Sequence, residues 1–104
     1  MTDAYEHNWH ECMTAAYHAD TALGLTVERM DITVDVDRAH IRLSHPQNAD
    51  FWVELQLYPT GWHARGPVVP TPCVYPRANA AGKQAGQMLR KALIEHRLLT
   101  PLKG

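Results

Sequence analysis

Seven histidines in a chain of 104 residues make metal binding the first chemistry to consider. His7, His10 and Glu11 lie close together near the N-terminus. A helical zinc site needs the order His-Glu-x-x-His, which places two ligands four residues apart with the general-base glutamate between them. Here the two histidines are three residues apart, the glutamate follows both, and the other histidines are scattered along the chain. The sequence therefore predicts no metal site and no cofactor.

The serine and the two cysteines give no pattern typical of a nucleophilic enzyme. Ser44 is the only serine and lacks the Gly-x-Ser-x-Gly turn of a nucleophile elbow. Cys12 and Cys73 are far apart in the sequence, so neither a structural zinc site nor a thioredoxin-type redox pair is indicated. Residues 82–84 read Gly-Lys-Gln and lack the upstream glycine and the Ser/Thr of a phosphate-binding loop. We therefore predict a protein without catalytic residues, and an enzyme of unrecognised type is the third choice of function.

The composition is that of one globular domain covering residues 1–104. Hydrophobic residues make up 45% of the chain and charged residues 20%, which is close to the average for folded domains. No run of about 18 apolar residues occurs, and residues 1–9 are acidic and polar, so we expect neither a membrane span nor a secretory signal. Two cysteines are too few for a disulfide scaffold, so the sequence favours a reducing compartment and predicts a cytoplasmic protein.

Helical spacing of apolar residues predicts a helix at each end of the chain. The first helix begins near Asp3, whose carboxylate can cap it, and ends before Gly24. The second helix covers residues 77–99, and its face near the start is small enough to approach a sheet closely. Gly82 and Gly86 lower its helix propensity. The apolar stripe of the first helix consists of Tyr5, Trp9, Cys12, Met13, Ala16, Ala19 and Leu23.

Between the helices, apolar and polar residues alternate in four segments, at 29–36, 39–43, 51–58 and 62–65. Such alternation predicts strands with one buried face, joined by short turns into antiparallel hairpins. Residues 66–76 contain four prolines and are expected to form an extended connection or an edge segment. The predicted fold class is α+β: a helix, a four-stranded antiparallel meander sheet and a helix, with both helices packed on one face of the sheet. The expected core consists of Trp9, Met13, Ile32, Val34, Ile41, Val53, Leu55, Leu89 and Leu93.

Two surface features are candidates for binding a partner. Trp52 and Tyr58 alternate out of phase with the apolar positions of their strand, so we expect them on the opposite face of the sheet, unless residues 67–76 fold back over Trp52. Exposed Trp and Tyr side chains are favoured anchors of protein interfaces. The second feature is a cationic stripe on the second helix, formed by Lys83, Arg90 and Arg97 at intervals of seven residues, with Gln87 and Lys91 beside them. The alternative interpretation of this stripe is an ordinary solvated helix face.

The stripe belongs to a segment that resembles the second helix of double-stranded-RNA-binding domains. Those domains also run helix, strands, helix, and residues 82–93, GKQAGQMLRKAL, are similar to their second helix. The family contacts phosphates through a cluster of lysines at the start of this helix, where only Lys83 matches and Gly82 and Gly86 stand instead of further lysines. The resemblance implies an alternative function, a nucleic-acid-binding domain that uses Lys83, Arg90, Lys91 and Arg97.

Charge is divided unevenly between the two halves of the chain. Residues 1–50 contain nine acidic and three basic side chains, whereas residues 51–104 contain two acidic and seven basic ones. These halves either make a bipolar molecule, whose field steers association with a charged partner, or cancel across the fold. Our first choice of function is a small non-catalytic protein-binding module, such as an accessory inhibitor that a phage or mobile element directs against a host complex, for example a CRISPR-type defence assembly. The sequence leaves the partner's identity and the oligomeric state open.

Overall fold

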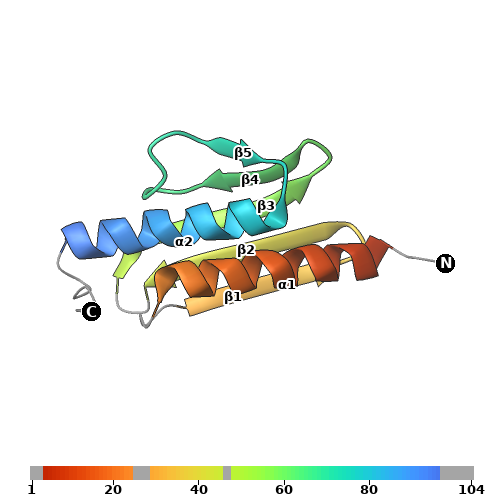
Figure 1. The fold of residues 1–104 in the computed structure, drawn as a ribbon, viewed down its shortest axis with the longest axis horizontal. Coiled ribbons are helices and arrows are strands. Elements are labelled where there is room, and N and C mark those ends of the chain that lie inside the picture. The colour runs from red at the N-terminus through yellow and green to blue at the C-terminus, as the bar shows by residue number, and fades with distance from the viewer. Residues whose placement is uncertain (1–3, 25–28, 46–47, 97–104) are drawn as a thin grey trace.

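A computed structural model describes residues 4–24, 29–45 and 48–96 of the chain. The predicted α+β class is confirmed, because a helix is followed by antiparallel strands and a second helix (Figure 1). Neither helix in these parts of the chain is apolar enough along its length to cross a membrane. The expected capping residue Asp3 and the basic residue Arg97 lie outside the described residues. The elements are α1 (Ala4–Leu23), β1 (Arg29–Asp35), β2 (Arg38–His45), β3 (Asn48–Tyr58), β4 (Gly61–Arg65), β5 (Cys73–Tyr75) and α2 (Ala78–Glu95).

The sheet has five strands in the order β1-β2-β3-β4-β5, one more than the predicted four. Each strand pairs antiparallel with its sequence neighbour, so the meander itself is as expected. The additional strand, β5, lies within the proline-rich segment and pairs with β4, with Cys73 opposite Ala64. Its three residues stand between Pro72 and Pro76, and a strand this short shows no alternation that could be recognised in the sequence. The sequence predicts either an extended connection or an edge segment for residues 66–76, and their strand β5 lies at the edge of the sheet.

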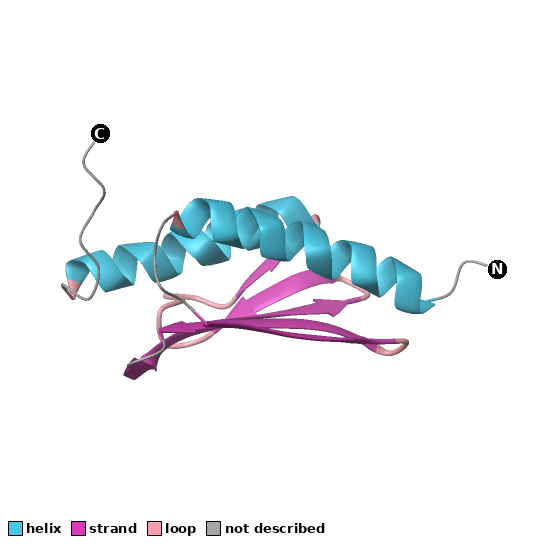
Figure 2. Ribbon diagram, turned by 90° about the horizontal axis from the view of Figure 1, so that it is seen from below, coloured by secondary structure: helices cyan, strands magenta, loops and turns pink. Residues whose placement is uncertain are grey.

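Both helices cover the same face of the sheet, as predicted (Figure 2). α1 packs over β1 and β2, whereas α2 packs over β3, β4 and β5. Ile41, Val53 and Leu55 of the sheet are fully buried between the layers. Leu89 and Leu93 of α2 are also buried there, so these five core assignments are confirmed. Met13 and Val34 are partly buried against this core.

The two glycines of α2 lie against α1. A side-chain carbon placed at Gly82 would collide with the carbonyl oxygen of Ala15, and one at Gly86 would lie 2.6 Å from that of Ala19. The two helices therefore approach so closely that only glycine fits at these two positions of α2.

The assignment of Trp9 and Ile32 to the core is wrong, because both side chains are exposed. Trp9 is 42% exposed and Ile32 is 39% exposed. The buried side of α1 is centred on small residues, including Ala15 and Ala19, because the close contact with α2 pulls that side inward. Trp9 is thereby turned toward the edge of the helix layer. Ile32 has the alternation of a core residue but belongs to β1, the edge strand, where the helix layer ends.

Candidate functional site

Both helices lie on one face of the sheet, so the other face is open (Figure 2). This open face carries polar and aromatic side chains of the strands. Successive strand residues point to opposite faces, so Val53 and Leu55 pack under the helices while Trp52 and Glu54 lie on the open face. The antiparallel register then aligns side chains from different strands into rows across the sheet. One row contains Asp31 of β1, Arg42 of β2, Glu54 of β3 and Arg65 of β4, with alternating charge.

Glu54 is the centre of this row. Arg65 Nε donates a hydrogen bond to Glu54 Oε1 at 2.8 Å, while His40 Nε2 and Arg42 Nη1 lie 3.3 Å and 3.8 Å from Glu54 Oε2. Burial raises the pKa of this carboxyl, but the hydrogen bonds and charges of Arg65 and His40 together outweigh it, and the pKa lies below its ordinary value. The row also joins Asp31 of the acidic half of the chain to Arg65 of the basic half, so the two halves partly neutralise each other within the sheet.

Trp52 is held between two neighbours on the open face. The guanidinium carbon of Arg42 lies 4.4 Å from the centre of the Trp52 ring, which is the geometry of a cation–π contact. On the other side, a side-chain carbon placed at Gly66 would lie 3.1 Å from Trp52 Cε3. Trp52 is therefore half-buried rather than freely exposed. Farther along the proline-rich segment, Val69 is buried in the core.

Tyr58 lies next to His63 at the β3–β4 turn. Their ring centres are 4.4 Å apart, and Thr60 Oγ1 is 2.7 Å from His63 Nε2, so the imidazole is fixed on two sides. Val74 of β5 pairs with His63 in the ladder and is exposed. A shallow hollow of about 230 Å³ opens between these residues, Glu54 and Arg65. We call the following set the open-face patch: Arg42, Trp52, Glu54, Tyr58, His63, Arg65 and Val74.

Of the predicted site residues, the structure places Trp52 and Tyr58 on one surface. They lie on the open face of β3, as expected from the alternation. The position of Glu54 on this surface follows from the same alternation, whereas sequence reasoning missed Arg42 and Arg65 as members of it. The alternation alone places each of them on the polar face of its strand, but the register is needed to show that they meet.

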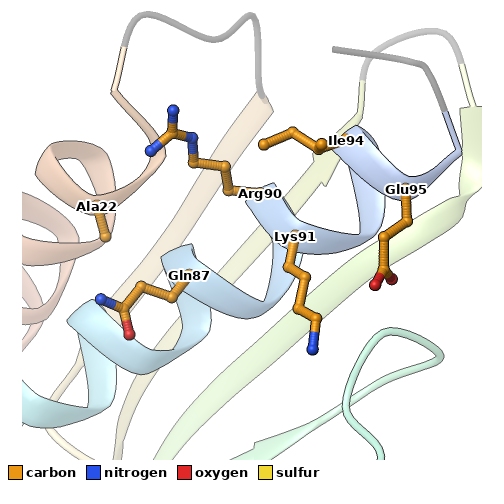
Figure 3. Close-up of a pocket in the computed structure, with 6 residues that line it drawn as sticks. All are labelled: Ala22, Gln87, Arg90, Lys91, Ile94 and Glu95. Atoms are coloured by element: carbon orange, nitrogen blue, oxygen red, sulfur yellow. The ribbon is translucent and has the colours of Figure 1, made fainter. Parts of the chain in front are cut away.

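The cationic stripe of α2 is only partly assembled. Lys83 and Lys91 are exposed, whereas Arg90 is half-buried. The Nε atom of Arg90 is buried and has no hydrogen-bond partner in the described part of the chain. Figure 3 shows that Arg90 and Ile94 project to one side of α2 and Lys91 to another. These three side chains line a hollow of about 400 Å³ with Ala22, Gln87 and Glu95.

Glu11 and Cys12 of α1 have structural roles. Glu11 accepts a hydrogen bond from Trp62 Nε1 at 3.1 Å, which ties α1 to β4. Cys12 is fully buried, and this burial raises the pKa of its thiol to about 11, so the thiol stays protonated at neutral pH. Across residues 4–24, 29–45 and 48–96, no three side chains of His, Cys, Asp or Glu gather closely enough to hold a metal ion.

Comparison of the chain with protein family models, with curated proteins and with solved structures found no match.

Proposed function

We propose that this protein is a non-catalytic binding module that recognises another protein through the open-face patch. The observation that carries the proposal is the arrangement around Glu54, where one carboxylate holds Arg65 and faces Arg42, and Arg42 in turn lies over Trp52. Trp, Tyr and Arg are the residue types most enriched among interface hot spots. Here all three types share one exposed surface.

The patch is ordered before a partner arrives. Immobilising long side chains at an interface costs about 0.5–1.5 kcal/mol for each of them, and a surface that is already held in place avoids part of this cost. The hydrogen bond from Arg65 to Glu54, the stacking of Arg42 on Trp52 and the contact of Tyr58 with His63 all restrict side-chain motion in this way. The contacts therefore favour binding as well as stability.

The expected partner surface combines an apolar ridge with a carboxylate. Trp52, Tyr58 and Val74 offer apolar area, while the side chain of Arg65 is 70% exposed and uses its Nε to bond Glu54. A carboxylate of the partner would bind the exposed guanidinium group of Arg65, because guanidinium groups bind carboxylates with two parallel hydrogen bonds. We also propose that the partner is a cytoplasmic host complex, for example a defence assembly that this protein, encoded by a phage, would block. The two free cysteines support a reducing compartment.

The proposal is tested by measuring the affinity of two open-face variants and two control variants for the same partner. The wild-type protein is used as bait in an extract of its native host, and the protein it retains is purified for calorimetry. Trp52→Ala and Tyr58→Ala remove the aromatic groups of the open-face patch. Each is expected to weaken binding by about 2 kcal/mol, or roughly 30-fold, which is the effect of losing a hot-spot aromatic residue.

Tyr5→Ala is the matched control, because Tyr5 is 47% exposed and Tyr58 is 44% exposed, but Tyr5 lies on α1. This variant should bind like the wild type. Lys83→Glu with Lys91→Glu is the second control and changes the charge of α2. If this pair lowers the affinity and Trp52→Ala and Tyr58→Ala do not, the binding surface lies on α2 and the proposal is wrong.

Nucleic acid is the alternative ligand and has its own assay. A mobility-shift assay with duplex RNA and duplex DNA at physiological salt should show no binding tighter than tens of micromolar, roughly the non-specific range, because the chain has a net charge of −1. A complex at nanomolar protein that is lost with Lys83→Glu and Arg90→Glu would favour a nucleic-acid-binding domain instead.

A further inference from the structure

The β1 edge of the sheet exposes more large apolar side chains than any other part of the described surface. Seven such side chains are exposed, and Trp9, Tyr17 and Ile32 lie on α1 or β1, as does Tyr5 near the start of α1. Figure 1 shows α1 running along β1 at this border of the sheet. Met13, partly buried, lies between Trp9 and Tyr17 at the same four-residue spacing, so these three side chains share one side of the helix.

At Ile32 the helices no longer cover the sheet. The neighbour of Ile32 across the ladder, Ile41 of β2, is fully buried, whereas Ile32 is not. On the opposite side of α1, Ala15 and Ala19 contact α2. The helix layer is therefore closed on the side of α2 and open on the side of β1, and an apolar strip runs from Ile32 to the exposed flank of α1.

The two edges of the sheet differ in how they are protected against pairing. β5 has three residues and stands between Pro72 and Pro76, which cannot donate backbone hydrogen bonds. β1 has seven residues, contains no proline and pairs with β2 without any register shift. Short strands, prolines, bulges and charged side chains are the usual devices that keep an edge from pairing, and of these β1 has only its charged residues Arg29, Asp31 and Asp35.

We propose that β1 pairs with β1 of a second copy of this chain, which makes a symmetric dimer with one continuous sheet of ten strands. Ile32 is the central residue of β1, so an antiparallel pairing centred on Ile32 uses the whole strand. This register places Ile32 opposite the same residue of the second copy, Met30 opposite Val34, and Asp31 opposite Thr33.

The acidic residues of β1 select this register among its neighbours. A pairing centred on Asp31 would set two aspartates directly opposite each other, and one centred on Thr33 would set Asp31 opposite Asp35. Like charges at directly opposed positions of a ladder are destabilising. Of these three registers, the one that pairs the full strand is therefore also the one that opposes no like charges.

The symmetry also covers the apolar strip. A twofold axis perpendicular to the sheet keeps the helices of both copies on the same side, so the two α1 helices lie next to each other across the axis. Trp9, Met13 and Tyr17 of one copy then face the same helix of the other copy. Burial of these side chains together with Ile32 supplies the apolar contact that an isolated strand pair lacks.

The mass of the purified full chain, measured by light scattering and by sedimentation, tests this inference. The wild type is expected at twice its chain mass of 11.7 kDa. Ile32→Lys places two like charges together at the twofold axis and should return the protein to a single chain, with unchanged circular dichroism. Val74→Lys makes the same kind of change at an exposed position of β5, the opposite edge, and should leave the dimer intact.

Substitutions at Thr33 test the register without touching the apolar strip. Thr33→Asp sets a carboxylate opposite Asp31 of the second copy and should weaken the dimer at least tenfold, whereas Thr33→Arg sets a guanidinium there and should strengthen it. A wild type with the mass of one chain at every concentration, or a dimer that survives Ile32→Lys, overturns the inference. Either result leaves the proposed function untouched, because the open-face patch lies on a different surface.

Discussion

The two faces of this sheet are built from the same strands but are held by different interactions. On the covered face, Val53 and Leu55 are fully buried against the helices. On the open face, their strand neighbour Glu54 is 14% exposed and is bonded to Arg65 of the next strand. Apolar burial has no required direction, so many arrangements of neighbours satisfy it. A hydrogen-bonded carboxylate needs donors at particular positions, and those positions depend on the register between strands.

This difference separates stability from recognition. The covered face supplies most of the folding free energy, since each fully buried aliphatic side chain contributes about 1.5–3 kcal/mol. The open face contributes less to folding, because ion pairs near the surface contribute about 0–1 kcal/mol each. Substitutions on adjacent residues of β3 should therefore have unequal effects on the free energy of unfolding.

Leu55→Ala should have the largest effect on stability. Leu55 is fully buried in the centre of the sheet, so its truncation removes apolar contacts and leaves a cavity, at a cost of about 2–5 kcal/mol. Urea unfolding followed by circular dichroism measures the change as a lower midpoint. Gln56→Ala, the next residue on the opposite face, is the control and should change stability by about 0.5 kcal/mol or less. Equal losses for the two variants would contradict the division between the faces.

Gly82→Ala should have the next largest effect. Alanine has a higher helix propensity by about 1 kcal/mol, so the substitution would stabilise an unrestricted helix. Here the added carbon would collide with the carbonyl oxygen of Ala15, and α1 and α2 would have to separate. We expect a net loss of about 1–3 kcal/mol. Gln84→Ala, at an exposed position of α2, should be neutral or slightly stabilising. A stabilised Gly82→Ala protein would mean that the helices are farther apart.

Glu54→Gln should have a smaller effect that depends on pH. The pKa of Glu54 lies below its ordinary value of 4.5, so its ionised form stabilises the folded state at neutral pH, and this contribution is lost as the pH falls below 4.5 through the folded-state pKa. The variant should lose about 1 kcal/mol at neutral pH. The difference from wild type should shrink in acid and also at about 1 M salt, which screens exposed ion pairs. A difference in stability between wild type and variant that does not depend on pH would show that the charge of Glu54 does not stabilise the row of charged side chains.

Tyr58→Ala should have the smallest effect on folding. The side chain is exposed and its described ring contact is with His63, so its loss should cost about 0.5 kcal/mol. The same substitution is expected to have a large effect on binding. Thermal unfolding of the variant, measured on the sample used for calorimetry, shows whether the two effects separate.

The fold class could be predicted because each element shows its own apolar period. The four longer strands and both helices follow this rule, whereas β5 does not, since three residues between prolines carry no period. The errors at Trp9 and Ile32 have a common cause. Periodicity identifies an apolar side of an element but does not show where the covering layer ends, and in this protein it ends at β1.

The candidate site could be predicted only in part. Alternation places Trp52 and Tyr58 on the open face, and it depends on one strand alone. The pairing of Glu54 with Arg42 and Arg65 depends on the registers of three strands, and the register of β2 with β3 shifts between Ser44 and His45. Ser44 lies opposite Trp52 whereas His45 lies opposite Asn48, so β3 is displaced by three residues relative to β2 at this point, and the sequence alone does not reveal such a shift.

Site-specific photocrosslinking in the native host tests the central claim most directly, because it captures the partner whatever protein that is. A photoreactive phenylalanine analogue is placed at Tyr58 or Val74 on the open-face patch, and at Lys83 or Gln87 on α2 as controls. All four side chains are exposed, so the reactive group is accessible at each position. The account predicts that both open-face positions crosslink to one and the same protein and that the α2 positions do not. Crosslinks to a protein or nucleic acid from the α2 positions, with none from Tyr58 or Val74, would contradict it.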